Sequence, residues 1–324
     1  MKKCCFIIPY FGKFPSYFPV FLKTCAYNKD FNWLVITDDK TQYDYPDNFK
    51  VVYLKFSELQ SLVKTKFPDF DAIMPFSRKL CDYKPSYGYL FEKYIEGYHS
   101  WGHCDVDTIM GNLNHFITEN MLEKYDKIGC LGHFIIYRNT KENNRVFMST
   151  YKGEKLYQKV FSHPETFWFD EEYKDDKNIN QIFLAQDKKV CQTDYSMNST
   201  FLQSAFQRIK YVGKQTDGAD EHGYVKEQIR KHLYVWEKGN LYRYRLEGEM
   251  LRKEEFAYMH FQSRNMKYNS QILVEDKFKI VPNKFIPLEV EKITLDNFSK
   301  IKKNSICFQY LELKYNNLRK KLKL

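Results

Sequence analysis

At 324 residues, the chain can bury a large core, as one large domain or one domain with an appendage. Its 27 Phe and 26 Tyr predict a core rich in aromatic side chains. It has no run of about 18 apolar residues, which argues against a transmembrane helix. The apolar part of residues 1–9 is too short for a secretory signal, and we interpret it as a first strand.

The net charge of +10 is distributed unevenly along the chain. Residues 300–324 contain eight basic side chains and one acidic side chain, so the remainder of the chain is nearly neutral. A body with so little excess charge does not resemble a general nucleic-acid binder, and we expect no nucleic-acid partner.

The eight cysteines are scattered, and none forms a C-x-x-C pair. In a chain of this length, that pattern predicts reduced thiols and a cytoplasmic protein.

The first quarter of the chain has an alternating β-α-β pattern. Strands are predicted at residues 4–8, 33–37 and 51–54, with a helix at residues 17–27 after the first strand. This order predicts a parallel sheet that binds ligands at the carboxyl ends of its strands. Tyr10, Asp38 and Asp39 lie at such ends, where an acid can accept hydrogen bonds from a ribose or base. Alternatively, the two acids only cap the following turn.

Two helices are predicted next. The first spans residues 57–67 with Ser57 as its N-cap, and the second runs from Lys79 to about Tyr94 after a loop at 68–78. Lys79 and Lys84 are placed to reach a diphosphate or sugar from the start of the second helix. The alternative is that both lysines are simply solvated.

The motif Asp105-Val106-Asp107 follows a predicted strand at residues 100–104. Residues i and i+2 of an extended segment point to the same face, so both carboxylates can face one ion. Mg²⁺ and Mn²⁺ prefer oxygen ligands and leave positions for substrate phosphates. The alternative is a surface turn. His103 and Cys104 could also suggest a zinc site. No second Cys or His follows at a fixed short spacing to complete it, which argues against zinc.

The remainder of the chain mixes short helices, strands and loops, without a P-loop, G-x-S-x-G or G-x-G-x-x-G motif. Their absence argues against kinases, hydrolases and dinucleotide oxidoreductases. We predict helices at residues 112–125, 139–147 and 181–187, strands at 127–131, 132–137 and 256–261, a hairpin at 233–249 that turns at 238–240, a lid or acceptor loop at 151–176 and a loop at 210–223.

These features occur in the order typical of one known fold. With its first strand, the Asp38-Asp39 strand end, the helix start at 84–88, the Asp105-x-Asp107 motif and His260, the chain resembles GT-A-fold glycosyltransferases over about residues 1–270. It is most similar to small bacterial enzymes of capsule and lipopolysaccharide assembly. The resemblance implies an α/β fold with a Rossmann-like, mostly parallel central sheet flanked by helices, followed here by a basic helical tail.

In the retaining galactosyl- and glucosyltransferases of that fold, the D-x-D motif binds Mn²⁺ or Mg²⁺ and a C-terminal His completes the site. The resemblance therefore implies metal binding by Asp105, Asp107 and His260. The chain departs from the H-x-x-G-x-x-K pattern of the family, because Ser263 replaces the Gly and Met266 occupies the Lys position. Phosphate contact then falls to Arg264 or Lys267.

Three further residues receive roles by the same resemblance. Asp170 and Glu171 are implied near the reacting sugar carbon or the acceptor hydroxyl, and His133 is placed for acceptor contact. The alternative for His133 and His260 is an ordinary buried or capping histidine.

We therefore expect a catalytic domain at residues 1–270, with a nucleotide-sugar half at about 1–110 and an acceptor half at about 111–270, and an extension at 271–324. The expected function is transfer of a hexose from a nucleotide sugar, UDP-Gal or UDP-Glc, to a glycan or lipid-linked oligosaccharide. The alternatives are a nucleotidyltransferase-like phosphate enzyme and a non-catalytic membrane-surface protein with the same fold.

The tail has an apolar stripe beside clustered cations. Leu311, Tyr315, Leu318 and Leu322 recur at helical spacing. A basic amphipathic helix of this kind is typical of contact with an anionic membrane, which predicts a peripheral location on the inner face of the cell membrane. Alternatively, the stripe docks on the protein itself. The cations are Arg319, Lys320, Lys321 and Lys323.

Overall fold

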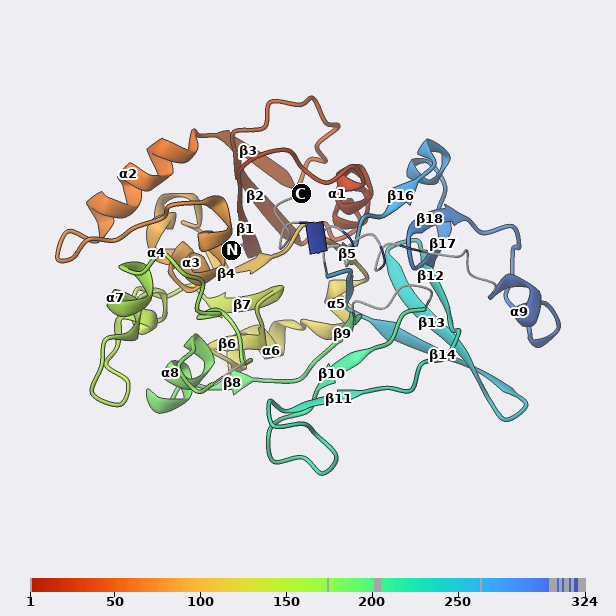
Figure 1. The fold of residues 1–324 in the computed structure, drawn as a ribbon. Coiled ribbons are helices and arrows are strands. Elements are labelled where there is room, and N and C mark those ends of the chain that lie inside the picture. Colours follow the sequence, from red (N-terminus) through yellow and green to blue (C-terminus); the bar gives the residue numbers. More distant parts are fainter. Residues whose placement is uncertain are drawn as a thin grey trace.

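The structure is a computed structural model that describes residues 2–173, 175–200, 205–262, 264–302, 308, 311, 315, 318 and 319. Its N-terminal part is built on a seven-stranded sheet in the order β3-β2-β1-β4-β7-β6-β8 (Figure 1). Strand β7 runs antiparallel to both of its neighbours, and the other four pairings are parallel. The prediction of a mostly parallel sheet flanked by helices is therefore confirmed. The strands are β1 (Lys2–Tyr10), β2 (Phe31–Thr37), β3 (Phe49–Tyr53), β4 (Tyr98–Cys104), β6 (Lys127–Leu131), β7 (Phe134–Arg138) and β8 (Val190–Cys191).

Strands β1 and β2 lie inside this sheet rather than at its edges, and their apolar runs supply side chains to both faces. Cys5 and Ile7 of β1 pack on one face, against helices α2, α3, α4, α7 and α8. Phe6 and Ile8 pack on the other, against α1 and the pair α5 and α6. The helices are α1 (Phe18–Ala26), α2 (Phe56–Lys66), α3 (Leu80–Tyr83), α4 (Tyr87–Leu90), α5 (Leu113–Phe116), α6 (Glu119–Lys124), α7 (Leu156–Phe161) and α8 (Ile179–Ala185).

Four predicted helices differ from the observed ones in detail. Helix α2 has Lys55 rather than Ser57 as its N-cap, because Glu58 accepts a hydrogen bond from the Lys55 amide. The helix predicted from Lys79 to Tyr94 is instead a chain of short turns, in which Pro85 supplies no amide donor. These turns are α3, α4 and the 3₁₀ helices η1 (Ser77–Lys79), η2 (Lys84–Ser86) and η3 (Glu92–Tyr94).

The helix predicted at residues 112–125 is divided into α5 and α6. The division falls at Thr118, whose side chain accepts a hydrogen bond from the amide of Met121 and so caps a new helix. The helix predicted at 139–147 is the 3₁₀ helix η4 (Asn143–Met148), and the loop predicted at 151–176 contains α7.

The C-terminal part is built on a six-stranded sheet in the order β14-β13-β12-β17-β18-β16, which lies to the right in Figure 1. The predicted hairpin is present, with Lys238 and Gly239 both at positive φ in its turn. The boundary predicted near residue 270 falls inside this sheet, between β16 and β17. The strands are β12 (Leu233–Glu237), β13 (Asn240–Glu247), β14 (Met250–Phe256), β16 (Lys267–Tyr268), β17 (Lys277–Val281) and β18 (Lys284–Pro287), with the 3₁₀ helix η5 (Ser270–Leu273) between β16 and β17.

A three-stranded sheet in the order β5-β15-β9 lies between the two large sheets (Figure 1). It joins β5 (Thr108–Met110), β9 (Ser196–Asn198) and β15 (Tyr258–His260), which come from three distant parts of the sequence. Strands β10 (Ile209–Tyr211) and β11 (Tyr224–Lys226) pair separately.

Most of the predicted tail helix lies outside the described residues. Helix α9 (Leu295–Ile301) precedes it. Leu311, Tyr315 and Leu318 are in helical conformation and highly exposed. Leu322 and the cations at positions 320, 321 and 323 lie outside the described residues, so the basic helix stays a prediction. Among the described helices, none combines the length and hydropathy needed to cross a membrane.

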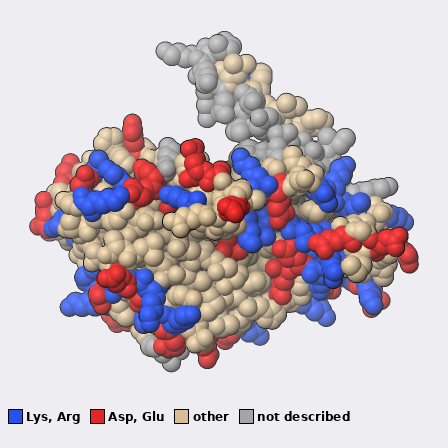
Figure 2. Space-filling view, turned by 90° about the horizontal axis from the view of Figure 1, so that it is seen from below, with Lys and Arg blue, Asp and Glu red and all other residues tan. Residues whose placement is uncertain are grey.

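Charged side chains of both signs are interspersed over the described surface seen in Figure 2. No extended area of one sign is visible there. The absence of a nucleic-acid partner stays a prediction.

Candidate metal and donor site

The acidic motif forms the short connection between β4 and β5, at the carboxyl end of β4. Its backbone is fixed from two sides. The Asp105 amide donates to the His133 carbonyl at 3.1 Å, and the Phe261 amide donates to the Asp107 carbonyl at 2.9 Å. The two carboxylates therefore project from a connection that is tied to both the β6–β7 turn and β15.

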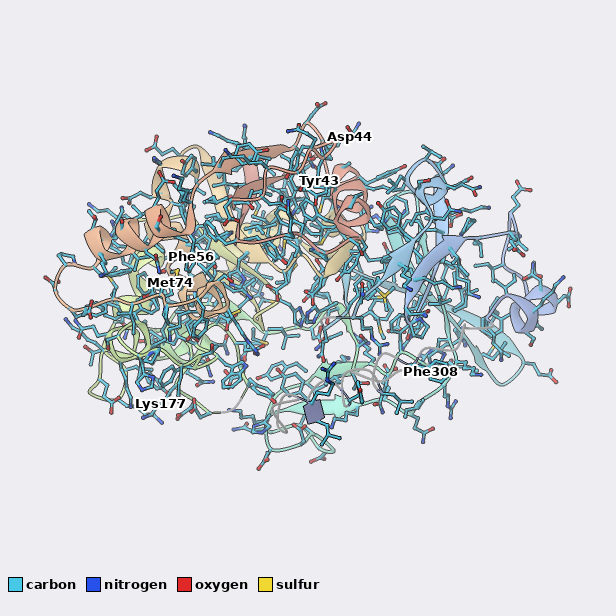
Figure 3. The ribbon with its side chains drawn as sticks, turned by 45° about the horizontal axis from the view of Figure 1, so that its top comes forward. Tyr43, Asp44, Phe56, Met74, Lys177 and Phe308 are labelled. Carbon is cyan, nitrogen blue, oxygen red and sulfur yellow. The ribbon has the colours of Figure 1, made fainter. Side chains whose placement is uncertain are left out.

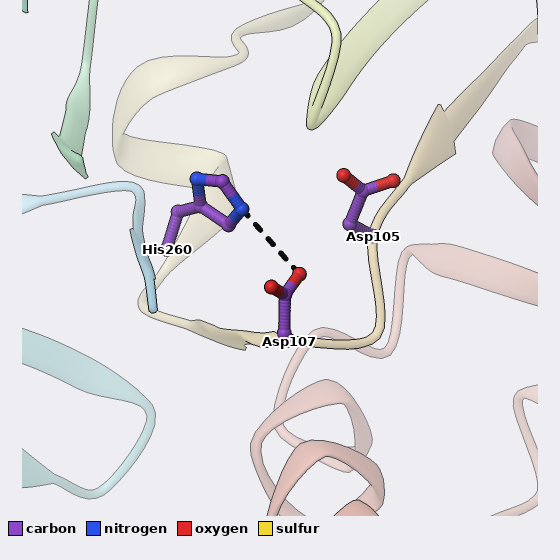
Figure 4. A group of neighbouring side chains, drawn as sticks. All are labelled: Asp105, Asp107 and His260. Atoms are coloured by element: carbon purple, nitrogen blue, oxygen red, sulfur yellow. Dashed lines mark ion pairs between the residues drawn. The ribbon is translucent and has the colours of Figure 1, made fainter. Parts of the chain in front are cut away.

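His260 is brought to this connection by strand pairing. Strand β15 pairs antiparallel with β5, with His260 opposite Thr108. Its Nε2 lies 3.4 Å from Oδ1 of Asp107 (Figure 4). Burial acts to lower the pKa of His260, but Asp107 and Asp105 outweigh burial and raise it.

Ligand atoms of Asp105, Asp107 and His260 all lie within 4.8 Å of one another. Two carboxylates and one imidazole are a donor set that Mn²⁺ or Mg²⁺ accepts, with coordination positions left for phosphate oxygens. The residues present thus fit the divalent ion that the sequence predicts.

Lys84 connects the acidic motif to a second pair of carboxylates. Its ammonium lies 2.8 Å from Asp105 and 3.1 Å from Asp170, and it donates to the Gly132 carbonyl at 2.8 Å. Burial acts to lower the pKa of Lys84, but the two carboxylates outweigh burial and raise it. Lys84 is therefore a buried cation that pairs with both Asp105 and Asp170. The alternative that this lysine is simply solvated is wrong.

Asp170 belongs to this ion-pair group and Glu171 follows it in the chain, while their predicted catalytic role near the reacting sugar stays a prediction. Burial raises the pKa of Asp170 to about 6. Burial, with the nearby charge of Asp170, raises the pKa of Glu171 to about 7. Glu171 also accepts a hydrogen bond from the amide of Gly132 at 3.4 Å. Carboxyls with raised pKa values are suited to proton transfer near neutral pH.

A cleft of about 540 Å³ opens beside the acidic motif, at the carboxyl ends of β1 and β4. Five predicted site residues line it, namely Tyr10, Lys84, Asp105, Asp107 and Arg264. The buried guanidinium of Arg264 donates to the carbonyls of Thr200 and Pro282, so it also supports the wall of the cleft.

Asp38, Asp39 and Lys267 are not in that lining. Asp38 accepts a hydrogen bond from the Gly12 amide at 2.8 Å. Asp39 is buried and accepts hydrogen bonds from the Lys13 ammonium, the Phe14 amide and Thr41. Both acids thus hold the loop after β1, and the bonds from Thr41 to Asp39 also lie in the turn after β2, where the capping alternative expected them. Lys267 is exposed on β16. Their donor-contact roles stay predictions.

His133 packs against His260, one of the three candidate metal ligands. Its side chain is buried, and its ring stacks on that of His260 with the centroids 4.2 Å apart. Burial, with the nearby charge of His260, lowers its pKa. In this position His133 supports the ring of His260. Its role in acceptor contact stays a prediction.

The cleft also contains residues that the sequence did not single out as site residues. His103 alone had a local signal, since it precedes Asp105 by two positions on the same strand face. Arg78 is exposed at the cleft, and no ion pair is formed by it within the described part of the chain. The other unpredicted lining residues whose side chains carry polar or sulfur atoms are Tyr17, Ser77, Cys81, Tyr87, Cys104 and Asn265.

Among solved structures, the chain is similar to the galactosyltransferase LgtC in complex with donor and acceptor sugar analogues, at 7% identity and a TM-score of 0.35, covering 60% of this chain and 75% of that one. An active-site mutant of LgtC is similar at 8% identity and a TM-score of 0.31, covering 60% and 74%. No curated protein matches. A family model matches residues 6–289, so the chain belongs to the family of unknown function DUF6625.

Proposed function

We propose that this protein is a metal-dependent glycosyltransferase that moves a hexose from a nucleotide sugar to a glycan or lipid-linked oligosaccharide. The observation that carries the proposal is the convergence of Asp105, Asp107 and His260 beside the 540 Å³ cleft. The pair Asp170 and Glu171 is joined to the same site through Lys84.

The transfer breaks the bond between the sugar C1 and the diphosphate oxygen and forms a bond from C1 to the acceptor oxygen. A divalent cation at Asp105, Asp107 and His260 would neutralise the charge of the diphosphate leaving group. The hydroxyl proton of the acceptor has to be removed, and Glu171 or Asp170 is the nearby carboxyl suited to accept it. Lys84 keeps Asp105 and Asp170 at a fixed separation.

Tyr10 lies at the end of β1 in the cleft, and this position supports the proposal that it contacts the uridine or ribose of a UDP-hexose donor. We further propose that the tail concentrates the enzyme at an anionic membrane, where a lipid-linked acceptor would be found. Three exposed apolar side chains on the tail support this, namely Leu311, Tyr315 and Leu318.

The test is a release assay with UDP-Gal, UDP-Glc and other nucleotide sugars, with Mn²⁺ or with EDTA. Asp107→Asn should reduce release of UDP at least 100-fold with little change in Tm. The matched control is Asp44→Asn, because Asp44 is exposed on the loop between β2 and β3, at the outer edge of the molecule (Figure 3).

Full activity in EDTA would refute the metal-dependent mechanism. Release of pyrophosphate from a nucleoside triphosphate, without release of UDP from any nucleotide sugar, would instead favour the nucleotidyltransferase alternative.

A further inference from the structure

We propose that Asn198 is a positioning residue that sets the tautomer and the ring orientation of His260. The inference rests on the metal site of the proposed function, and it assigns a role to a residue that has no recognisable motif around it.

Strand pairing places Asn198 beside His260. Strand β9 runs parallel to β15 with Asn198 opposite His260. Oδ1 of Asn198 lies 3.0 Å from Nδ1 of His260, and the Asn198 side chain is buried. The next residue, Ser199, donates to the His260 carbonyl from its amide at 3.3 Å and from its hydroxyl at 3.1 Å. Both the backbone and the ring of His260 are therefore held by this short segment.

The direction of the hydrogen bond follows from the atoms involved. An amide oxygen only accepts, so Nδ1 of His260 carries the proton. In the neutral ring, the lone pair is then on Nε2, the atom that faces Asp107 at 3.4 Å. Gln262 also donates to Oδ1 of Asn198, at 3.3 Å, which orients this oxygen rather than the amide nitrogen toward the ring. Outer partners of this kind commonly fix metal-binding histidines.

His133 supports the same ring by packing. Its ring is inclined by 27° to that of His260, and neither of its nitrogens has a hydrogen-bond partner in the described part of the chain. Stacking restrains the plane of the His260 ring but does not select which nitrogen is protonated. Asn198 is therefore the contact that favours the proton on Nδ1, whereas the carboxylate of Asp107 faces Nε2.

Two variants of similar size separate the hydrogen bond from the shape of the side chain. Asn198→Asp keeps an oxygen that accepts from Nδ1, whereas Asn198→Leu removes the acceptor. The matched control is Asn144→Leu, because Asn144 is also buried and its Oδ1 also accepts one ring hydrogen bond, from Trp101 at 2.7 Å, outside the cleft lining.

The first measurement is the affinity of the full chain for Mn²⁺ alone, by electron paramagnetic resonance of the free ion. Asn198→Leu should bind Mn²⁺ about 10- to 100-fold more weakly than the wild type, and Asn198→Asp should bind at least as tightly. The second is the ¹⁵N NMR spectrum of the histidine rings in metal-free protein, at a pH high enough to leave the His260 ring neutral, with His260→Gln used to assign the signal. The wild type and Asn198→Asp should have the proton on Nδ1, and Asn198→Leu should show mixed tautomers.

Equal Mn²⁺ affinity and an unchanged tautomer in Asn198→Leu would overturn the inference. An equal loss in Asn198→Asp and Asn198→Leu, or in Asn144→Leu, would also overturn it, because shape or general stability would then explain the effect. Absence of Mn²⁺ binding by the wild type would refute the metal site itself, while the NMR measurement would still decide the tautomer.

Discussion

The ammonium of Lys84 lies 2.8 Å from a carboxylate oxygen of Asp105 and joins this candidate metal ligand to Asp170. Removing this cation should leave two carboxylates close together without a counter-charge. We predict that Lys84→Met lowers the free energy of unfolding by about 3 kcal/mol. Urea denaturation measures this directly.

The double variant Lys84→Met with Asp170→Asn provides the control for that prediction. It should recover part of the lost stability, because one of the two unpaired carboxylates is gone. A single and a double variant of equal stability would show that the charge of Asp170 is not what Lys84 offsets.

Glu171 should make the protein less stable as the pH rises. Its pKa is raised from 4.5 to about 7 in the folded chain, so its contribution to stability is present below pH 4.5 and is lost as the pH rises through 7. We compare the free energy of unfolding of Glu171→Gln with that of the wild type. The difference should shift in favour of Glu171→Gln between pH 5 and pH 8, by on the order of 2 kcal/mol. Unfolding curves from pH 5 to 8 measure this difference. Parallel pH profiles for the two proteins would contradict it.

Asp39 should contribute to stability in the opposite pH direction. Burial acts to raise its pKa, but hydrogen bonds from Lys13, Thr41 and the Phe14 amide outweigh burial and lower it. Its contribution is therefore present above the ordinary pKa of an aspartate and is lost as the pH falls through the folded value. Asp39→Asn should lower Tm at pH 7. The NH₂ group of Asn is a hydrogen-bond donor, and it would face the donors of Lys13, Phe14 or Thr41 without an acceptor.

The exposed neighbour Asp38 is the control for this change, since its carboxylate accepts a hydrogen bond only from Gly12 among the bonds described for it. Asp38→Asn should change Tm less than Asp39→Asn. If Asp39→Asn keeps its Tm but loses UDP binding, measured by thermal shift with UDP, Asp39 contacts the donor rather than the loop.

The tail prediction is tested by liposome flotation. The full chain should float with anionic vesicles and less with neutral ones, and a chain ending near Ser305 should remain unbound. High salt should weaken the binding, because salt screens the lysines and arginines. A chain with Leu311, Tyr315 and Leu318 changed to Ser retains the charges and tests the apolar stripe. Equal flotation of the full and shortened chains would refute the membrane role.

The sequence was most informative where local pattern determines the structure. The apolar run at residues 4–8 had to be a strand buried on both faces, and its order with the strands at 33–37 and 51–54 determined a parallel sheet. The position of Asp105 at a strand end followed from the same pattern.

The rest depended on contacts between distant residues. Asn198 had no local signal, because its contact with His260 exists only once β9 and β15 pair. Only the hairpin of the six-stranded sheet was predicted, because the pairing of β12 with β17 joins residues about 40 positions apart that share no local pattern. The helix expected from Lys79 was broken by tertiary packing as well as by Pro85. A Cβ at Gly88 would lie 2.3 Å from the Trp101 ring, so this turn fits tightly against β4.

The three-stranded sheet β5-β15-β9 has a consequence for the order of events during synthesis. Asp107, Asn198 and His260 are separated by up to roughly 150 residues, and they meet only after β15 has inserted between the other two strands. While residue 260 is still inside the ribosome, the growing chain contains Asp105 and Asp107 but not yet the imidazole of His260. On the proposed function, a metal ion would therefore be bound with all three ligands only once the three-stranded sheet is nearly complete, and pairings of such long range are expected to form slowly.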